Sequence, residues 1–319
     1  MKKIATRDVY GRTLVELGRE NQDIVVLDAD LAKSTKTIEF GKEFPHRFFD
    51  MGIAEQNLMG TAAGLAVAGK IPFVSTFAIF ATGRAFEQVR NTVVYPGLSV
   101  KIAATHAGIT VGEDGGSHQS IEDIALMRVL PGMRVVVPAD AEETAQAIRT
   151  AAASPGPFYI RLGRAGVPQI YDSSYRFELG KASVLRQGED AAVLACGVLV
   201  APALQAAEIL FNQGVRVTVI NISTIKPLDV KAVVEAARQT RAMVTAEEHS
   251  VIGGLGSAVA EVLGEHYPVP LERLGVADTF GESGSPEELL EKYGLTVAGI
   301  IAKVERVIAR KKTMFFKQS

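Results

Sequence analysis

The sequence contains almost no cysteine. Cys196 is the only one among 319 residues, so the chain can form neither an internal disulfide nor a zinc site built from four cysteines. An excess of charge of one sign is also lacking, because 34 Lys and Arg residues face 36 Asp and Glu residues. A net charge of −2 creates no general positive field, so neither nucleic acid nor a membrane surface is expected as a partner.

Long apolar runs are missing as well. The longest stretch, residues 191–204, contains Gly197 and Pro202 and is too short to cross a bilayer. The N-terminus has two lysines without an apolar segment after them, so no signal peptide is expected. The composition is 47% hydrophobic and 22% charged, as is usual for a globular protein. We therefore expect a cytoplasmic protein whose 319 residues form two domains, each with its own core.

Short β-branched runs alternate with longer helical patterns over the first half of the chain. Five runs are apolar on both faces and end in turn residues, which is typical of buried parallel strands. The alternation predicts an α/β fold with a mostly parallel sheet and helices on both of its faces. The expected strands are residues 23–28, 71–75, 99–104, 133–138 and 157–162, and the expected helices are residues 6–20, 54–68, 77–94, 121–129 and 141–153.

A polar and aromatic stretch, residues 171–188, interrupts this alternation. We place a linker at 176–188, which gives a first domain over 1–175 and a second over 189–319. The second domain shows the same kind of pattern, so it is also expected to have a mostly parallel sheet with helices on both faces. Its one polar cluster is Glu247-Glu248-His249, which is expected to cap a helix or to lie at an interface. The last nine residues are expected to fray. The strands expected in the second domain are residues 191–196, 215–220, 242–247 and 269–274.

One glutamate lies among apolar neighbours. Glu55 belongs to the segment FFDMGIAEQNLMG, close to Met51, Ile53 and Leu58. Burial there would favour the neutral form of the carboxyl group, which can donate a hydrogen bond to a ring nitrogen. The alternative is a glutamate that is stabilised at a helix N-terminus by the helix dipole.

Two aromatic residues follow the second expected strand. Phe77 and Phe80 are three residues apart, so they share one face of a turn or helix. Together they could form a platform for a flat heteroaromatic ring. Ordinary core packing explains the same spacing, so the pattern alone leaves both interpretations open.

A long loop, residues 105–125, collects polar groups after the third expected strand. It contains four glycines together with His106, Asp114 and His118. Ligands of open α/β sheets bind at the carboxyl ends of the strands, so these side chains are candidates for contacts to a phosphate or to sugar hydroxyls. The alternatives are a solvated loop and a metal site, although the spacing matches no standard zinc motif.

Two arginines occupy positions where an anion could bind. Arg7 opens the first expected helix, and Arg164 follows an expected strand in the segment LGRAG. A guanidinium group can bind two phosphate oxygens at once. For either arginine alone, a surface ion pair is the simpler explanation.

Taken in order, these segments resemble the C-terminal half of the transketolase family of thiamine-diphosphate enzymes. The resemblance rests on DADLAKS, MGIAEQ, STFAIF, THAGITVGEDGGSHQ and LGRAGVPQI, and it covers nearly the whole chain. It implies a pyrimidine-binding domain followed by the transketolase C-terminal domain. The sequence departs from the family pattern at Gly83, at Gly116 and at Ala54-Glu55-Gln56, which leaves the substrate less well defined.

The resemblance implies a role for each motif residue. Glu55 would be catalytic through a hydrogen bond to the aminopyrimidine ring of thiamine diphosphate, and His118 would be catalytic at the reacting oxygen of the substrate. The other residues that would contact the cofactor are Phe77, Phe80, Asp30 and Ile53. The residues that would bind substrate are Arg7, Ser34, His106 and Arg164 for the sugar phosphate, and Asp114 and His118 for its hydroxyl and carbonyl groups.

The chain lacks the family's GDG…N motif, which binds the metal ion and the diphosphate. We therefore expect no metal site here, and a partner subunit resembling the N-terminal half of transketolase that holds the diphosphate with Mg²⁺ or Ca²⁺. A two-plus-two heterotetramer would follow. The expected activity is transfer of a two-carbon ketol unit between phosphorylated sugars. The alternatives are the β subunit of a 2-oxo-acid dehydrogenase, half of a deoxyxylulose-phosphate synthase, and a non-catalytic interaction protein.

Overall fold

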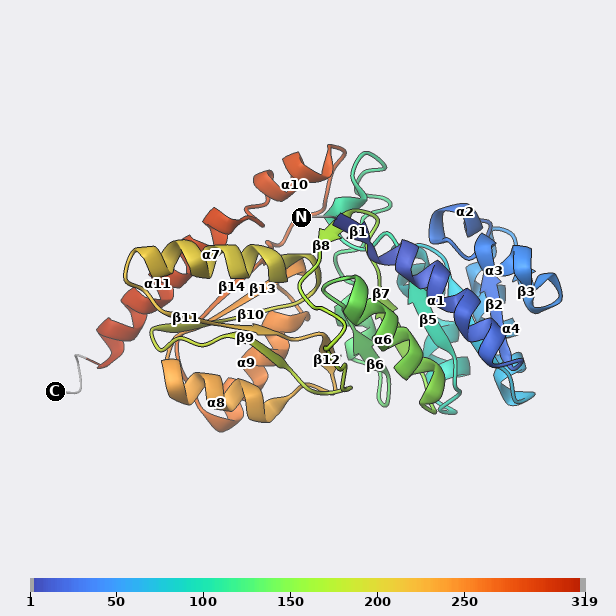
Figure 1. The fold of residues 1–319 in the computed structure, drawn as a ribbon, viewed down its shortest axis with the longest axis horizontal. Coiled ribbons are helices and arrows are strands. Elements are labelled where there is room, and N and C mark those ends of the chain that lie inside the picture. Colours follow the sequence, from blue (N-terminus) through green and yellow to red (C-terminus); the bar gives the residue numbers. More distant parts are fainter. Residues whose placement is uncertain (1–2, 316–319) are drawn as a thin grey trace.

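Two α/β units lie side by side along the long axis of the molecule (Figure 1). The structure is a computed structural model and describes residues 3–315. The first unit is built on a seven-stranded sheet and the second on a five-stranded sheet. In the second unit, α7 and α11 pack on one face of the sheet while α8 and α9 pack on the other. This arrangement confirms the predicted α/β fold with two mostly parallel sheets.

The first sheet has the strand order β12-β6-β7-β5-β4-β2-β3, and all of its neighbours are parallel except β12 and β6. The central strands are buried along their whole length, as expected for a parallel sheet that is covered on both faces. A separate antiparallel pair joins β1 to β8. The bounds are β1 (Lys3–Ala5), β2 (Ile24–Asp28), β3 (Phe48–Asp50), β4 (Ile71–Ser75), β5 (Lys101–Ala104), β6 (Arg134–Val136), β7 (Phe158–Arg161), β8 (Gly166–Pro168) and β12 (Thr224–Lys226).

Four of the five predicted helices of the first unit are present, whereas the short helices at Ala32–Thr35 and Ile38–Glu43 were not predicted. Residues 77–94, expected to form a regular helix, contain the π-helical segments η2 (Phe80–Arg84) and η3 (Gln88–Val94). In η2 the amide of Ala85 donates to the carbonyl of Phe80, five residues earlier. Such wide turns occur often at functional sites. The regular helices are α1 (Thr6–Glu20), α2 (Ala32–Thr35), α3 (Ile38–Glu43), α4 (Glu55–Val67), α5 (Asp123–Arg128) and α6 (Ala141–Ala153).

The second sheet has the order β14-β13-β10-β11-β9, with only β9 antiparallel to its neighbour. β9 lies inside the segment 176–188, so this predicted linker also supplies an edge strand. α11 continues to Phe315, so residues 311–315 are helical rather than frayed, and the rest of the tail lies outside the described residues. The bounds are β9 (Ser183–Arg186), β10 (Ala191–Ala195), β11 (Val217–Asn221), β13 (Met243–Ser250), β14 (Leu271–Val276), α7 (Val200–Asn212), α8 (Val230–Thr240), α9 (Leu255–His266), α10 (Pro286–Lys292) and α11 (Val297–Phe315).

The two units share apolar contacts as well as chain connections. One buried cluster extends from Val135 in the first sheet to Ile225 in β12 and Leu194 in the second sheet. β12 is contributed by the second half of the chain to the edge of the first sheet. The domain boundaries themselves stay a prediction, because the chain passes between the sheets more than once. Within residues 3–315, no helix has both the length and the apolar character needed to cross a membrane.

Candidate functional site

A cavity of about 460 Å³ opens at the carboxyl ends of the central strands of the first sheet. It lies where β2 ends at Asp28 and where the chain leaves β4 toward Phe80, which is the usual ligand position in open parallel sheets. Five of the predicted site residues line it: Asp30, Ile53, Glu55, Phe80 and His118. Its lining is Ala29, Asp30, Leu31, Ile53, Glu55, Phe80, Arg84, Ser117 and His118.

Glu55 is the first residue of α4, and its side chain is only 2% exposed. The neutral form of the carboxyl group, expected from the apolar neighbours in the sequence, stays a prediction. The guanidinium group of Arg84 donates from Nη1 to both carboxyl oxygens at 2.9 Å. The two side chains form an ion pair in which Glu55 is buried and Arg84 is half exposed. Burial of Glu55 is therefore compensated by a partner that no local pattern near residue 55 indicates.

Arg84 is the residue of the cavity that sequence reasoning missed. Its guanidinium carbon lies 4.6 Å from the centre of the Phe80 ring, and its side chain is 48% exposed. The spacing of four residues between Phe80 and Arg84 was visible in the sequence, and such a pair shares a helical face. Nothing in the sequence connected that face to Glu55, which is 29 positions away.

The two predicted aromatic residues differ in their positions. Phe77 and Phe80 lie 6.0 Å apart between ring centres with their planes 12° apart. Phe77 is 7% exposed and stacks on His106 at 3.8 Å, so it supports the site from beneath. Phe80 lines the cavity, and its ring centre lies 5.4 Å from that of His118 with the two planes 77° apart. Phe80 is thus the ring of the pair that lines the cavity, and its contact with a ligand stays a prediction.

His106 is buried and has a left-handed backbone conformation, with φ at 57°. Its Nδ1 lies 2.8 Å from the hydroxyl of Thr105, and its Nε2 lies 3.1 Å from Nη1 of Arg7. Burial, Arg7, Arg164 and His118 lower the pKa of His106 to about 3. The ring is therefore neutral at physiological pH, and Nε2 accepts a hydrogen bond from Nη1 of Arg7. The positive charge at this position comes from the arginines.

The residues predicted to bind a phosphate come together from separate segments. Arg7 donates to the carbonyl of Ser34 at 3.0 Å in addition to its contact with His106. Arg164 donates to the carbonyl of Val111 at 2.6 Å and lies 3.5 Å from the carboxylate of Asp114. Burial lowers the pKa of Arg7, and the charge of Arg164 acts in the same direction. We name Arg7, Ser34, His106, Asp114 and Arg164 the anion cluster; binding of a phosphate there remains a prediction.

Asp30 and Ile53 lie on the rim of the cavity, and Ile53 is 76% exposed. The turn that carries Asp30 is fixed from below by Asp28. This buried carboxylate accepts hydrogen bonds from the amide of Leu31 at 2.7 Å and from the hydroxyl of Thr35 at 2.6 Å. Burial raises the pKa of Asp28, while these donors lower it. The geometry of the turn that carries Asp30 thus depends on a carboxylate that is not part of the cavity lining.

The cavity fits one part of thiamine diphosphate better than the other. The carboxyl group of Glu55 beside the ring of Phe80 offers the hydrogen-bonding group and the aromatic face that an aminopyrimidine requires. For the diphosphate, the cavity lining offers one cation, Arg84, and it is paired with Glu55. Within residues 3–315, no three His, Cys, Asp or Glu side chains are grouped so that they could hold a metal ion.

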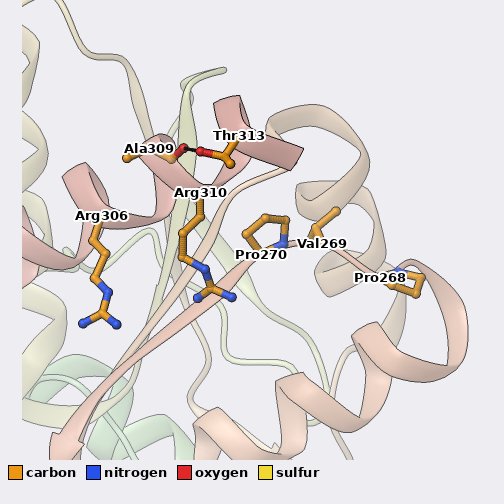
Figure 2. Close-up of a pocket in the computed structure, with 7 residues that line it drawn as sticks. All are labelled: Pro268, Val269, Pro270, Arg306, Ala309, Arg310 and Thr313. Atoms are coloured by element: carbon orange, nitrogen blue, oxygen red, sulfur yellow. Dashed lines mark hydrogen bonds between the residues drawn. The ribbon is translucent and has the colours of Figure 1, made fainter. Parts of the chain in front are cut away.

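A larger cavity of about 640 Å³ lies in the second unit, between α11 and the segment before β14 (Figure 2). Its polar side chains are Arg306, Arg310 and Thr313, and Arg310 is paired with Glu272. Its lining contains no cysteine, serine, lysine, carboxylate or histidine side chain. The cavity at Glu55 is therefore the candidate active site, although it is the smaller of the two.

Comparison with known proteins agrees with the resemblance. Residues 2–169 match the family profile for the transketolase pyrimidine-binding domain, and residues 180–300 match the transketolase C-terminal domain. A chain provisionally named as a transketolase C-terminal section, from Methanocaldococcus jannaschii, is 50% identical over 301 residues, which are 93% of this chain and 94% of that one. A 6-deoxy-6-sulfo-D-fructose transketolase subunit of Clostridium sp. is 47% identical, over 96% of this chain and 95% of the relative.

A solved structure described as a split-gene transketolase, an inactive β4 tetramer, has a TM-score of 0.89 and 57% identity. The match covers 97% of this chain and 100% of that one. Together with the two domain matches, it confirms the resemblance of the sequence to the C-terminal half of the family. The chain belongs to the transketolase family, and its two units are the family's pyrimidine-binding and C-terminal domains.

Proposed function

We propose that this chain is the C-terminal subunit of a split transketolase that transfers a two-carbon ketol unit from a ketose phosphate to an aldose phosphate. The observation that carries the proposal is the buried carboxyl group of Glu55, held at the start of α4 beside the face of Phe80 in an open cavity. Family membership supports the use of thiamine diphosphate. The anion cluster supports a substrate with a phosphate, because two arginines from distant segments meet there.

The site needs a second polypeptide. The cavity offers groups for the aminopyrimidine ring but no set of residues for a metal-bound diphosphate, so a partner resembling the N-terminal half of transketolase would supply that set with Mg²⁺ or Ca²⁺. The description of the related solved structure as an inactive β4 tetramer supports both self-association and dependence on another subunit. We infer a heterotetramer with two copies of each chain.

Each residue of this chain has a defined task in the proposed reaction. Thiamine diphosphate, when bound, supplies the electron sink for breaking and forming the carbon–carbon bond. Glu55 would bind the aminopyrimidine ring and hold or release a proton there, and Phe80 would fix the plane of the ring. Asp30 and Ile53 would close the rim around it, with Phe77 as support. His118 would stabilise charge on the substrate oxygen.

The anion cluster would orient the substrate at its other end. Arg7 and Arg164 carry the positive charge, while His106 is a neutral acceptor that directs the Arg7 guanidinium group. Ser34 completes the enclosure through its carbonyl contact with Arg7. Asp114 would accept a hydrogen bond from a sugar hydroxyl. A relative that is named for a sulfonated sugar supports an anionic donor in general, so phosphate and sulfonate sugars should be compared.

The decisive experiment uses this chain together with an N-terminal-half partner, thiamine diphosphate and Mg²⁺. We expect ketol transfer from xylulose 5-phosphate, and we expect Glu55→Gln to lower kcat by about 10²-fold or more because proton transfer at the cofactor is lost. Glu43→Gln, an exposed glutamate paired with Arg19, is the matched control and should leave kcat unchanged. Turnover of pyruvate instead would favour the dehydrogenase or synthase alternatives. Failure of the complex to bind thiamine diphosphate in calorimetry would favour a non-catalytic protein.

A further inference from the structure

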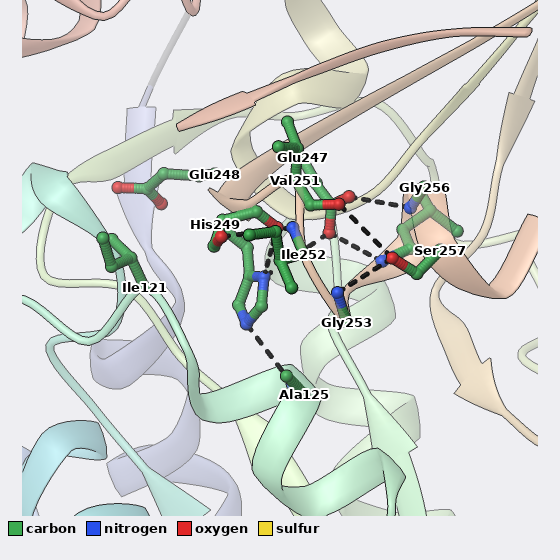
Figure 3. A network of polar contacts seen from close by, with 12 residues as sticks. Ile121, Ala125, Glu247, Glu248, His249, Val251, Ile252, Gly253, Gly256 and Ser257 are labelled. Atoms are coloured by element: carbon green, nitrogen blue, oxygen red, sulfur yellow. Dashed lines mark hydrogen bonds and ion pairs between the residues drawn. The ribbon is translucent and has the colours of Figure 1, made fainter. Parts of the chain in front are cut away.

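The loop that carries His106, Asp114 and His118 is held by the second unit of the molecule. It contacts the end of β13, where three consecutive ionisable residues, Glu247, Glu248 and His249, are all buried. Sequence reasoning expected a helix cap or an interface there, and the structure confirms both. Figure 3 shows the side chains of Glu247 and Glu248 leaving the strand in opposite directions, as alternation along a strand requires.

Glu247 acts within its own unit. Its carboxyl oxygens accept hydrogen bonds from the amides of Leu255 at 2.6 Å and Gly256 at 2.7 Å, so it caps the N-terminus of α9. The contact with Gly256 is drawn in Figure 3. Within residues 3–315, the carboxyl group of Glu247 makes no hydrogen bond or ion pair with the loop of the first unit, so Glu247 is a natural comparison for its neighbour.

Glu248 reaches across to the first unit. Its Oε1 accepts a hydrogen bond from the amide of Thr110 at 2.7 Å. Its Oε2 lies 3.7 Å from Arg161, and its own carbonyl accepts from the same guanidinium group at 2.9 Å. The carboxyl group also fills the space beside Gly108, because a Cβ atom there would lie 2.2 Å from Cδ of Glu248. Only a residue without a side chain at position 108 leaves room for the carboxyl group of Glu248.

The next two residues of β13 extend the same contact. The amide of Ser250 donates to the carbonyl of Ile121 at 2.7 Å. Nδ1 of His249 contacts the carbonyl of Ser250 at 2.8 Å, so it carries the proton, and Nε2 is left to accept from the amide of Ala125 at 3.3 Å. Figure 3 places Ile121 and Ala125 opposite this strand end. The second unit thus holds the loop at Thr110 and again at Ala125.

Thr110, which donates to Glu248, precedes the residue whose carbonyl binds Arg164 of the anion cluster. Val111 follows Thr110 in the turn η4 (Ile109–Val111), and its carbonyl accepts the 2.6 Å hydrogen bond from Arg164. A displacement of Thr110 therefore moves the acceptor that orients Arg164. The side chain of Gln119 also connects the carbonyls of Gly112 and Glu282, so the second unit restrains the loop next to His118 as well.

We propose that Glu248, a residue of the second unit that does not line the cavity, is a positioning residue for substrate binding: it fixes the Thr110–Val111 turn and through it the orientation of Arg164. This inference rests on the proposed function, since it assigns to Arg164 a substrate anion. It gives the C-terminal domain a specific part in the active site. Burial raises the pKa of Glu248. Glutamine has the same length and keeps an oxygen that can accept the hydrogen bond from the amide of Thr110, so it is the conservative substitution.

The test compares three variants at Glu248 with one at Glu247 in the complex with the partner subunit. We expect Glu248→Ala to raise KM for the phosphorylated donor tenfold or more while kcat changes less than threefold, because orientation of the anion is lost and the groups around Glu55 are not. Glu248→Gln should restore KM to within threefold of the wild type. Glu248→Asp keeps the charge but is one methylene shorter, and it should behave like the alanine variant. Glu247→Ala should lower thermal stability with KM unchanged.

A second readout does not depend on activity. Amide hydrogen exchange at Thr110 and Val111 should be at least tenfold faster in Glu248→Ala than in the wild type, and unchanged in Glu247→Ala. Equal KM values for Glu248→Ala and the wild type, or equal shifts for Glu247→Ala and Glu248→Ala, would overturn the inference. If Glu248→Ala does not fold, KM is compared between Glu248→Gln and Glu248→Asp instead. A higher KM for Glu248→Asp supports the inference, and equal KM values would overturn it. Absence of ketol transfer by the wild type would instead contradict the proposed function.

Discussion

At the scale of single residues, the ion pair between Glu55 and Arg84 occupies both carboxyl oxygens of the proposed cofactor-binding glutamate. Glu55 is almost fully buried, whereas the side chain of Arg84 is about half exposed. An aminopyrimidine that binds Glu55 must compete with this guanidinium group for the same oxygens. The ion pair offsets part of the cost of burying the carboxyl group of Glu55.

Replacement of Arg84 should therefore strengthen cofactor binding. We expect Arg84→Gln in the complex to lower the apparent Kd for thiamine diphosphate about threefold to tenfold, because Glu55 no longer has a competing partner. Isothermal titration of wild type and variant measures this, with Arg90→Gln on the neighbouring segment η3 as the control. A weaker affinity in Arg84→Gln would mean that this guanidinium group binds the cofactor instead.

His106 predicts a specific dependence of stability on pH. Its folded pKa is lowered to about 3, mainly by burial, whereas an unfolded histidine titrates near 6.5. Between these values the unfolded chain takes up a proton that the folded chain does not, so the free energy of unfolding falls as the pH decreases from about 6.5. We expect a loss of about 2 kcal/mol from pH 7 to pH 5 that is absent in His106→Gln. Urea unfolding at both pH values tests this, and equal losses in the two proteins would contradict it.

At the scale of elements, the segment that joins the two units depends on a buried cap. Asp140 precedes α6, and its Oδ1 accepts from the amide of Glu143 at 2.9 Å. Its Oδ2 accepts from the amides of Ile170 and Tyr171, at 2.7 and 2.8 Å. The carboxylate of Asp140 thus caps the N-terminus of α6 and also binds the backbone at residues 170–171, where the chain leaves the first sheet.

Removal of this cap should be costly. We expect Asp140→Ala to lower the free energy of unfolding by about 3 kcal/mol, because three amides lose their acceptor in a buried place. Ser285→Ala removes the cap of α10 near the surface and should cost about 1 kcal/mol. Chemical denaturation of both variants gives the comparison. A smaller effect for Asp140→Ala than for Ser285→Ala would show that other groups hold the exit from the first sheet.

The elements that sequence reasoning predicted are those set by local patterns. α1 and α6 have the predicted bounds, and β2, β4 and β7 lie within the predicted runs, because helical spacing and continuous apolar character are visible in short windows. The π-helical turns and the edge strand β12 were not predicted, since hydrogen bonding over five residues and pairing with β6 leave no local signature. The ion pair between Arg84 and Glu55 was not predicted for the same reason, because the two residues are 29 positions apart.

At the scale of the whole molecule, the proposed function gives this chain only part of the active site. Ile53, an exposed apolar side chain, lines the cavity, while the polar groups inside the cavity suit one half of the proposed cofactor. The second unit contributes to the same site, because Glu248 and the carbonyl of Glu282 hold the loop of the first unit. The assembled enzyme, rather than this chain, would then be the functional unit.

The central claim is tested most directly by a titration of activity. The concentration of this chain is held constant, thiamine diphosphate and Mg²⁺ are in excess, and the N-terminal-half partner is added while ketol transfer from xylulose 5-phosphate is measured. We predict no turnover by this chain alone and a linear rise that saturates at one partner per chain, with almost no rise for the Glu55→Gln chain. Full turnover before any partner is added, or equal turnover by the Glu55→Gln chain, would contradict the account.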